Sequence, residues 1–231
     1  MFTSWKKQTL RGKLTFLFLA PGSSDTTVKI WDTRSLASKP IQSLDDAGDT
    51  VSSIHIHMPT TSIITGSYDG RIRSYDLRRG ALTVDVMGHS VGSVRCSADG
   101  NTILASCLDG RIRLVDREDG GVLNAFGGQS DDGPSATSPS APVYRNQTLR
   151  LRSTFAKGDS IVISGSESDE GERPDASIFA WDVLSGDVVG TFHAGDVKVV
   201  SCVAWNEKGG SFAGGCSDGE CSSVTGDGIR A

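Results

Sequence analysis

The residues Gly215-Cys-Ser-Asp-Gly219 match the G-x-S-x-G pattern with which many hydrolases present a serine nucleophile. In those enzymes the serine stands on a sharp turn between a strand and a helix. No segment of helical periodicity follows Gly219, and the similar run Ser67-Tyr-Asp-Gly70 lies between two strand-like segments. We therefore predict a hairpin turn at Ser217, no catalytic residue and no enzyme; a serine hydrolase acting through Ser217 is the alternative.

The spacing of cysteine and histidine gives little support for a metal site. Cys216 and Cys221 form a single pair with four residues between them, and His193 is 23 residues before Cys216. Structural zinc needs four ligands, usually supplied as two closely spaced pairs. His55 and His57 alternate along a predicted strand and share one face, where two imidazoles could hold a metal only weakly. With no phosphate-binding or dinucleotide-binding glycine motif, we predict no metal, no cofactor and no small-molecule substrate.

Composition restricts the class of partner. The 231 residues include 23 Lys and Arg against 28 Asp and Glu, a net charge of −5, which argues against direct nucleic-acid binding. Five scattered cysteines do not form a secreted disulfide framework, so we expect reduced thiols and a location in the cytoplasm or the nucleus. No apolar run approaches the roughly 20 residues that a membrane helix needs. The 28 glycines indicate many turns.

A repeated pattern supplies the framework that must carry these residues. An aspartate is followed six residues later by an aromatic residue or valine, and directly after that by a second aspartate. The four copies are Asp25 with Trp31-Asp32, Asp69 with Tyr75-Asp76, Asp109 with Val115-Asp116, and Asp175 with Trp181-Asp182. Their spacings are 44, 40 and 66 residues, and a fifth turn begins at Asp218, after which we expect no strand. Such a period indicates one supersecondary unit repeated along the chain.

Each period divides into four strands joined by short turns. In the third copy the expected strands are residues 93–97, 102–107, 111–116 and 122–126, and in the second they are 51–56, 62–66, 71–76 and 81–86. In the fourth they are 149–155, 160–165, 177–182 and 188–192. The longer third spacing is explained by a Gly/Ser/Asp/Pro stretch at residues 127–142, interpreted as a disordered loop, and by an acidic insertion at residues 167–174.

These residues resemble WD40 repeats. Gly88-His89 precedes Val115-Asp116 by the interval typical of the family, and Trp31-Asp32 and Trp181-Asp182 repeat its signature. The resemblance implies an all-β, WD40-type β-propeller. It also implies a hydrogen-bonded tetrad that braces the third repeat, in which His89, Ser106 and Asp109 match the family and Val115 replaces the expected tryptophan.

Three runs narrow the resemblance to the mitogen-activated protein kinase organizer family. They are residues 23–34, 66–78 and 108–116. That family implies a non-catalytic scaffold for protein–protein interactions in a kinase cascade, and its relatives in spliceosomes imply a role in pre-mRNA splicing as the alternative. The resulting division is a non-matching segment 1–22, blades at 23–126, an insert at 127–148, further blades at 149–220 and a non-matching tail at 221–231.

This division predicts an incomplete propeller, with about three full four-stranded blades and a partial blade at each end. Blades bury their faces against their neighbours, so missing blades would leave apolar flanks and free strand edges. Three interpretations remain open: a truncated or mis-spliced gene product, which we favour; a ring completed by a partner or by self-association; and an open arc.

Two surface features are candidates for regulation and binding. Arg71 and Arg111 follow the turns after the second strands, and Arg73 and Arg113 lie two residues further along, on the same strand face. Four such arginines would suit an acidic peptide, and the alternative is that they brace turns or pair with Asp76 and Asp116. In the insert, Ser138 precedes Pro139 and is a candidate for proline-directed phosphorylation.

Overall fold

The computed structural model describes residues 18–19, 23–32, 39–128, 143–168 and 175–225 of the chain. Within these residues the elements are strands, arranged in five antiparallel sheets. The first two sheets contain β1 (Phe18–Leu19), β2 (Val28–Asp32) and β3 (Gln42–Leu44), and then β4 (Val51–His57), β5 (Ser62–Ser67), β6 (Arg71–Asp76) and β7 (Ala81–Val86). The third contains β8 (Val91–Cys96), β9 (Thr102–Cys107), β10 (Ile112–Asp116) and β11 (Val122–Phe126). The last two contain β12 (Ser153–Ala156), β13 (Ile161–Gly165), β14 (Ser177–Asp182) and β15 (Val188–His193), and then β16 (Val200–Asn206), β17 (Ser211–Cys216) and β18 (Cys221–Thr225).

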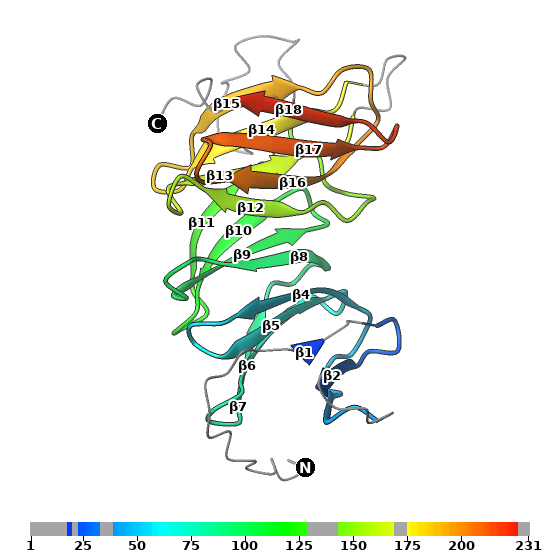
Figure 1. Ribbon diagram of the computed structural model, residues 1–231, viewed down its shortest axis with the longest axis vertical. Coiled ribbons are helices and arrows are strands. Elements are labelled where there is room, and N and C mark those ends of the chain that lie inside the picture. Colours follow the sequence, from blue (N-terminus) through cyan, green and yellow to red (C-terminus); the bar gives the residue numbers. More distant parts are fainter. Residues whose placement is uncertain (1–17, 20–22, 33–38, 129–142, 169–174, 226–231) are drawn as a thin grey trace.

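In the three four-stranded sheets each strand pairs with the next one along the chain, so every sheet is a meander. We call the four strands of such a sheet a, b, c and d in chain order; the first sheet then has b, c and d, and the fifth has a, b and c. The sheets stack one behind another, with β4, β8, β12 and β16 side by side (Figure 1). The described sheets do not close into a ring, which confirms the predicted all-β, incomplete propeller.

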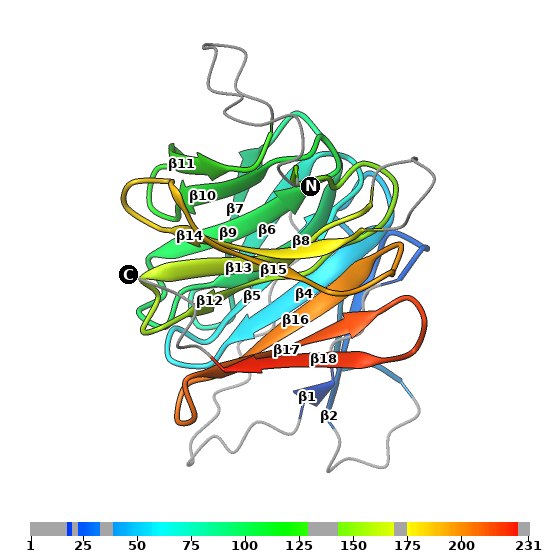
Figure 2. The ribbon, with the colours of Figure 1, turned by 90° about the horizontal axis from the view of Figure 1, so that it is seen from above.

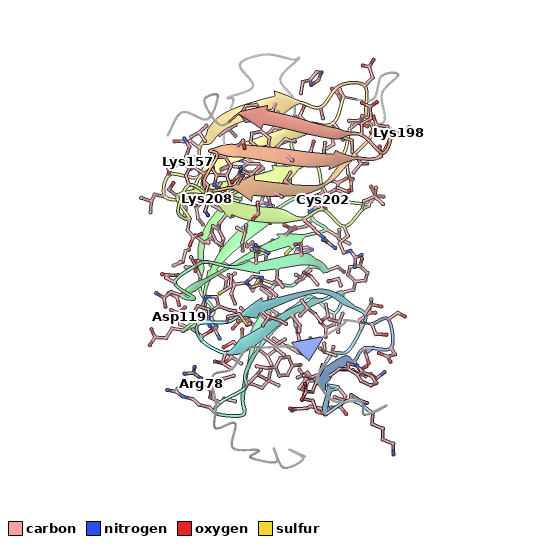
Figure 3. The ribbon with its side chains drawn as sticks, in the orientation of Figure 1. Arg78, Asp119, Lys157, Lys198, Cys202 and Lys208 are labelled. Carbon is pink, nitrogen blue, oxygen red and sulfur yellow. The ribbon has the colours of Figure 1, made fainter. Side chains whose placement is uncertain are left out.

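The sheets have two opposite rims. The turns between strands b and c lie with the sheet-to-sheet connections at one end, the b–c rim, as the hydrogen bond from Tyr68 N to Thr50 O shows. The a–b and c–d turns lie at the other end, the a–b rim. Figure 3 shows the two rims on opposite sides, with Arg78, Asp119 and Lys157 on the a–b side and Lys198 on the b–c side.

Apolar side chains fill the space between successive sheets. Ile64 and Ile72 of the second sheet pack with Val91 and Ile103 of the third in one cluster. Between the third and fourth sheets the cluster is aromatic, with Phe126, Tyr144, Phe179 and Trp181 in contact. Since both faces of a central sheet are covered, β5 and β13 are buried along their whole length. This packing is the reason that neighbouring sheets are held as one rigid framework.

Four elements differ from the sequence prediction by two residues or more. Strand β8 spans Val91–Cys96 rather than residues 93–97. Strand β12 begins at Ser153 rather than at residue 149, because the amides of residues 147–149 bind the Glu167 carboxylate instead of a neighbouring strand. Strand β18 lies where no strand was expected, and its backbone pairs with β17 although its sequence has no clear alternation. Strand β1 lies in segment 1–22, which was assigned to no repeat, yet it pairs with β2. Residues 129–142, most of the expected loop, and residues 169–174 lie outside the described part.

Candidate protein-interaction surface

The repeated aromatic or valine position is equivalent in four sheets. Trp31, Tyr75, Val115 and Trp181 are each the penultimate residue of strand c, and the last residue is the second aspartate of the repeat. Tyr75 pairs with Ile63 of strand b, and Val115 and Trp181 pair with the corresponding Ile103 and Val162. The repeat in the sequence is therefore a repeat in space.

The aspartate that ends strand c organises the turn to strand d. The Asp76 carboxylate accepts hydrogen bonds from the backbone amides of Arg78 at 2.8 Å and Arg79 at 3.0 Å. Asp182 accepts from the amides of residues 184 and 185 in the same way, and these bonds lower its pKa. Asp116 accepts from the amide of residue 118. Asp32 ends β2 at the same position. Asp76, Asp116 and Asp182 thus fix the shape of the a–b rim in the three four-stranded sheets.

The first aspartate of the repeat organises the opposite, b–c rim. Asp69 and Asp109 accept from the amides of Arg71 at 3.1 Å and Arg111 at 3.2 Å, and glycine follows each aspartate with a φ of +77°. Asp25 accepts from the amide of residue 27, and Asp218 from that of residue 220. Asp175 is exposed, and its backbone oxygen accepts from the hydroxyl of residue 177. Glycine is needed at residues 70 and 110 because other residues rarely adopt this φ.

In the second sheet this aspartate also binds an arginine inside the molecule. The Arg73 side chain is 2% exposed and donates from Nη2 to Asp69 Oδ2 at 2.6 Å and from Nη1 to Asp69 Oδ1 at 3.3 Å. Nη1 also donates to Ser67 Oγ at 2.9 Å, and the Ser67 hydroxyl donates to Asp69. Burial alone would raise the pKa of Asp69, but these hydrogen bonds and one from the Gly48 amide outweigh it and hold the pKa well below its usual range.

The third sheet repeats this pair with a looser environment. Arg113 donates to both carboxylate oxygens of Asp109, at 2.5 and 3.2 Å, and His89 Nε2 lies 3.7 Å from Asp109 Oδ2. Cys107, the residue after Ser106, occupies the place that Ser67 has in the second sheet, because the two residues pair with the equivalent Val91 and Val51. The Ser106 hydroxyl instead meets the Ser153 hydroxyl of the fourth sheet at 2.6 Å. The structure thus brings His89 and Asp109 together and places Ser106 in contact with another blade.

The four-arginine surface proposed from the sequence needs correction. Arg73 is buried and Arg113 is largely buried, and both are paired with aspartates of their own turns, so neither is available to a partner. Arg71 and Arg111 are exposed on the b–c rim. Their side chains, rather than all four, remain as a candidate contact surface. Gly128, the last described residue before the gap at 129–142, lies against Arg111.

The other candidates from the sequence lie apart from this surface. Ser217 is in the hairpin turn between β17 and β18, so the strand–turn–helix geometry of a hydrolase nucleophile is missing there. His57 is buried between Thr60 Oγ1 at 2.7 Å and Ala98 O at 3.2 Å. Within the described ranges, no three His, Cys, Asp or Glu side chains gather as metal ligands, and no helix is long and apolar enough to cross a membrane. Ser138 lies outside the described residues.

Two residues that the sequence interpretation did not single out connect the b–c rim internally. Glu167 is buried and its carboxylate accepts from the amides of Gln147, Thr148 and Leu149, at 3.2, 3.0 and 2.6 Å. Arg150 Nη1 donates to Ser52 O at 2.7 Å across the stack of sheets. No local motif marks either residue, because their partners are 18 to 98 residues away.

Comparison with known proteins agrees with this geometry. The sequence pattern of the family described as "WD domain, G-beta repeat" matches residues 38–76 and 81–116. The chain is 37% identical over 173 residues to an uncharacterised WD repeat-containing protein of Schizosaccharomyces pombe, covering 71% of this chain and 50% of that protein. It is 33% identical over 173 residues to WD repeat domain-containing protein 83 of Rattus norvegicus, covering 75% of this chain and 47% of that protein. A homologue of the latter in Dictyostelium discoideum is 37% identical over an alignment of 90 residues, and the match covers 28% of each chain.

The chain thus spans about half the length of the first two curated relatives. The first match of the family pattern begins just before β3, strand d of the first sheet, and ends at Asp76, the end of strand c of the second sheet. The second match begins with β7, strand d of the second sheet, and ends at Asp116, the end of strand c of the third. The family pattern and the structural repeat therefore end at the same aspartates.

Proposed function

Because this chain is a WD40-repeat protein, we propose that it acts as a non-catalytic platform on which other proteins assemble. WD40 repeats in general mediate protein–protein interactions, and the names of the relatives include no enzyme. The observation that carries the proposal is the b–c rim, where aspartates fix the turns and leave Arg71 and Arg111 exposed. A fixed rim that presents charged side chains suits recognition of other proteins because little conformational entropy is lost on binding.

We further propose that the assembled proteins belong to a mitogen-activated protein kinase cascade. The support is the resemblance of residues 23–34, 66–78 and 108–116 to the organizer family of that cascade. Splicing proteins are the alternative partners, supported by relatives of the same family. A location in the cytoplasm or the nucleus fits both, and it is supported by the five scattered cysteines, which do not form the disulfide framework of a secreted protein.

Affinity purification of the tagged protein from cells, followed by mass spectrometry, tests the platform. Wild type should retain a defined set of proteins, and Arg71→Glu with Arg111→Glu should lose members of it while far-UV circular dichroism stays unchanged. Arg78→Glu is the matched control, because Arg78 is exposed on the opposite rim (Figure 3). Kinases of the cascade in the set would support the first assignment, and spliceosomal proteins the second. No retained protein at all would refute the platform.

A further inference from the structure

The first strands of four sheets form one continuous face. Strands β4, β8 and β12 are each the outermost strand of their sheet on the same side, as is β16, and they lie next to one another (Figures 1 and 2). We call the surface made by these four strands, and by the residues that lead directly into them, the inner face.

Arg150 lies across this inner face. It belongs to the connection that enters the fourth sheet, yet its Nη1 donates to the carbonyl of Ser52 in the second sheet at 2.7 Å. Between the two, Arg150 Cγ lies 3.5 Å from the place that a Cβ would occupy on Gly92 of the third sheet. A side chain that reaches from the fourth sheet to the second over the third can do so only along the inner strands.

Two further arginines occupy the same face. Arg152 is exposed and directly precedes β12, and its backbone amide donates to Ser201 O of β16 at 3.1 Å, which places it between the inner strands of the fourth and fifth sheets. Among the described residues, its guanidinium has no hydrogen-bond or ion-pair partner. Arg95 is exposed on β8, three residues beyond Gly92 and thus about 10 Å further along the strand. The three arginines are therefore attached to the inner face at positions that run from the b–c rim toward the a–b rim.

The charges of Arg150, Arg152 and Arg95 have no carboxylate partner in the part of the chain that the structure describes. By contrast, Lys29, Arg73 and Arg113 each pair with one. The pKa of neighbouring His55 is lowered to about 4, first by burial and second by the positive charge of Arg95. The His55 imidazole is therefore neutral at physiological pH and adds no charge to this face. A chain with a net charge of −5 has thus gathered unpaired cations on one face. Such a patch is complementary to a short anionic ligand.

We propose that the inner face binds an extended acidic peptide segment of a partner protein, whose carboxylates are held by Arg150, Arg152 and Arg95. Arginine suits this ligand because its planar guanidinium binds a carboxylate through two parallel hydrogen bonds. An extended peptide of about three to four residues spans the roughly 10 Å of strand between Gly92, beside which Arg150 lies, and Arg95. A polynucleotide fits less well, because the negative net charge would repel its long phosphate backbone. This inference rests on the proposed platform function and assigns its ligand class.

A fluorescein-labelled octapeptide of alternating Asp and Glu is the probe. Fluorescence anisotropy with the full chain should show saturable binding that weakens as salt is raised. Arg150→Glu with Arg152→Glu should weaken binding by about tenfold or more, since charge-assisted hydrogen bonds are lost and repulsion is introduced. Arg152→Glu alone should weaken it severalfold without disturbing any described side-chain contact. Arg78→Glu with Arg79→Glu, which reverses two exposed charges on the a–b rim, should leave the affinity unchanged.

Three outcomes would overturn the inference. The first is equal affinity in wild type and Arg152→Glu, and the second is equal loss in the a–b rim control. The third is tighter, arginine-dependent binding of a single-stranded oligonucleotide of the same charge, which would make this a nucleic-acid site. If wild type retains partners from cells and the inner-face variants retain the same set, only this inference fails. If wild type retains none, the platform itself fails.

Discussion

Replacing Asp69 with asparagine should destabilise the fold far more than its position at the molecular surface suggests. Asparagine is isosteric and keeps an oxygen for the Arg71 amide, so the turn itself is retained. The Arg73 guanidinium, 2% exposed, would lose the only carboxylate described within hydrogen-bonding distance. Removing one member of a buried ion pair leaves an uncompensated charge and costs about 3–5 kcal/mol. Because the Asp69 side chain is 12% exposed, we expect the lower end, about 3 kcal/mol.

The chain contains its own graded controls for this reasoning. In Asp109→Asn the same spacing is kept, but Arg113 is 15% exposed, so water compensates part of the charge and we expect a loss of about 1–2 kcal/mol. In Asp25→Asn the partner is Lys29, and the two side chains are 41% and 48% exposed. An exposed pair of this kind contributes little, because water screens the two charges, so we expect the smallest loss of the three variants.

The measurement is urea unfolding of the four proteins, followed by circular dichroism and tryptophan fluorescence at neutral pH. The free energies of unfolding should fall in the order Asp25→Asn, Asp109→Asn, Asp69→Asn at equal denaturant dependence. Adding Arg73→Met to Asp69→Asn should restore part of the loss, because the unpaired charge is removed. Equal losses in Asp69→Asn and Asp25→Asn would refute the argument from burial.

The dependence of stability on pH at low pH is a second test of the Asp69–Arg73 ion pair. The pKa of Asp69 is lower in the folded chain than its ordinary value of 3.8, so the folded state favours the charged carboxylate. The resulting stabilisation is complete above about pH 4 and is lost as the pH falls further, toward the folded-state value. The acid-induced loss of stability below pH 4 should therefore be smaller in Asp69→Asn than in wild type, and an unchanged acid limb would contradict the assignment.

Three other predictions test the packing between sheets. Gly165→Ala would place a methyl group 2.2 Å from Val200 O and should cost more than about 3 kcal/mol in urea unfolding, whereas Gly92→Ala, with no contact under 3.5 Å, should cost about 1 kcal/mol or less. His55 has a pKa of about 4 when folded against 6.5 ordinarily, so protonation favours the unfolded state; stability should fall between pH 6.5 and 4, and His55→Gln should lack this part of the decline. Arg117→Ala removes three hydrogen bonds, two of them to side chains of the preceding sheet, and should lower the unfolding free energy by about 1–3 kcal/mol, partly recovered in Arg117→Lys.

The repeat itself was readable from the sequence because its signals are local. Asp69-Gly70 and Asp109-Gly110 form turns through contacts within two residues, and their glycines adopt a φ that other residues avoid. The strands predicted next to these turns agree with β6, β9 and β10 within one residue. Where a turn motif is absent, as between Gln147 and β12, the observed start of the strand at Ser153 differs from the predicted start by four residues.

Glu167 shows what such local signals omit. In the sequence it begins an acidic run at residues 167–174 and looks like part of a solvated insertion. In the structure its carboxylate is buried against backbone amides of residues 147–149, and these bonds lower its pKa although burial opposes the charge. The amides come from a segment that is neither strand nor helix, so no periodicity could announce the contact. Only the packing of two connections at one rim brings them together.

The prediction that Arg73 and Arg113 are exposed was wrong because of how the sheets pack in this fold. Along a strand, residues two apart share a face, so Arg71 and Arg73 were assigned to one surface. In an isolated sheet with one wet face, that parity would separate exposed from buried positions. Here both faces of each central sheet are covered by neighbours, so exposure depends on the distance to the rim and not on the face. Arg71 begins β6 at the rim and is exposed. Arg73, two residues further along the strand, is buried, and its charge is compensated by the carboxylate of Asp69. The Asp-x-x-x-Arg spacing of residues 69 and 73, repeated at 109 and 113, therefore indicates an internal ion pair. In stacked blades this spacing should predict the burial of the arginine better than the alternation of strand faces does.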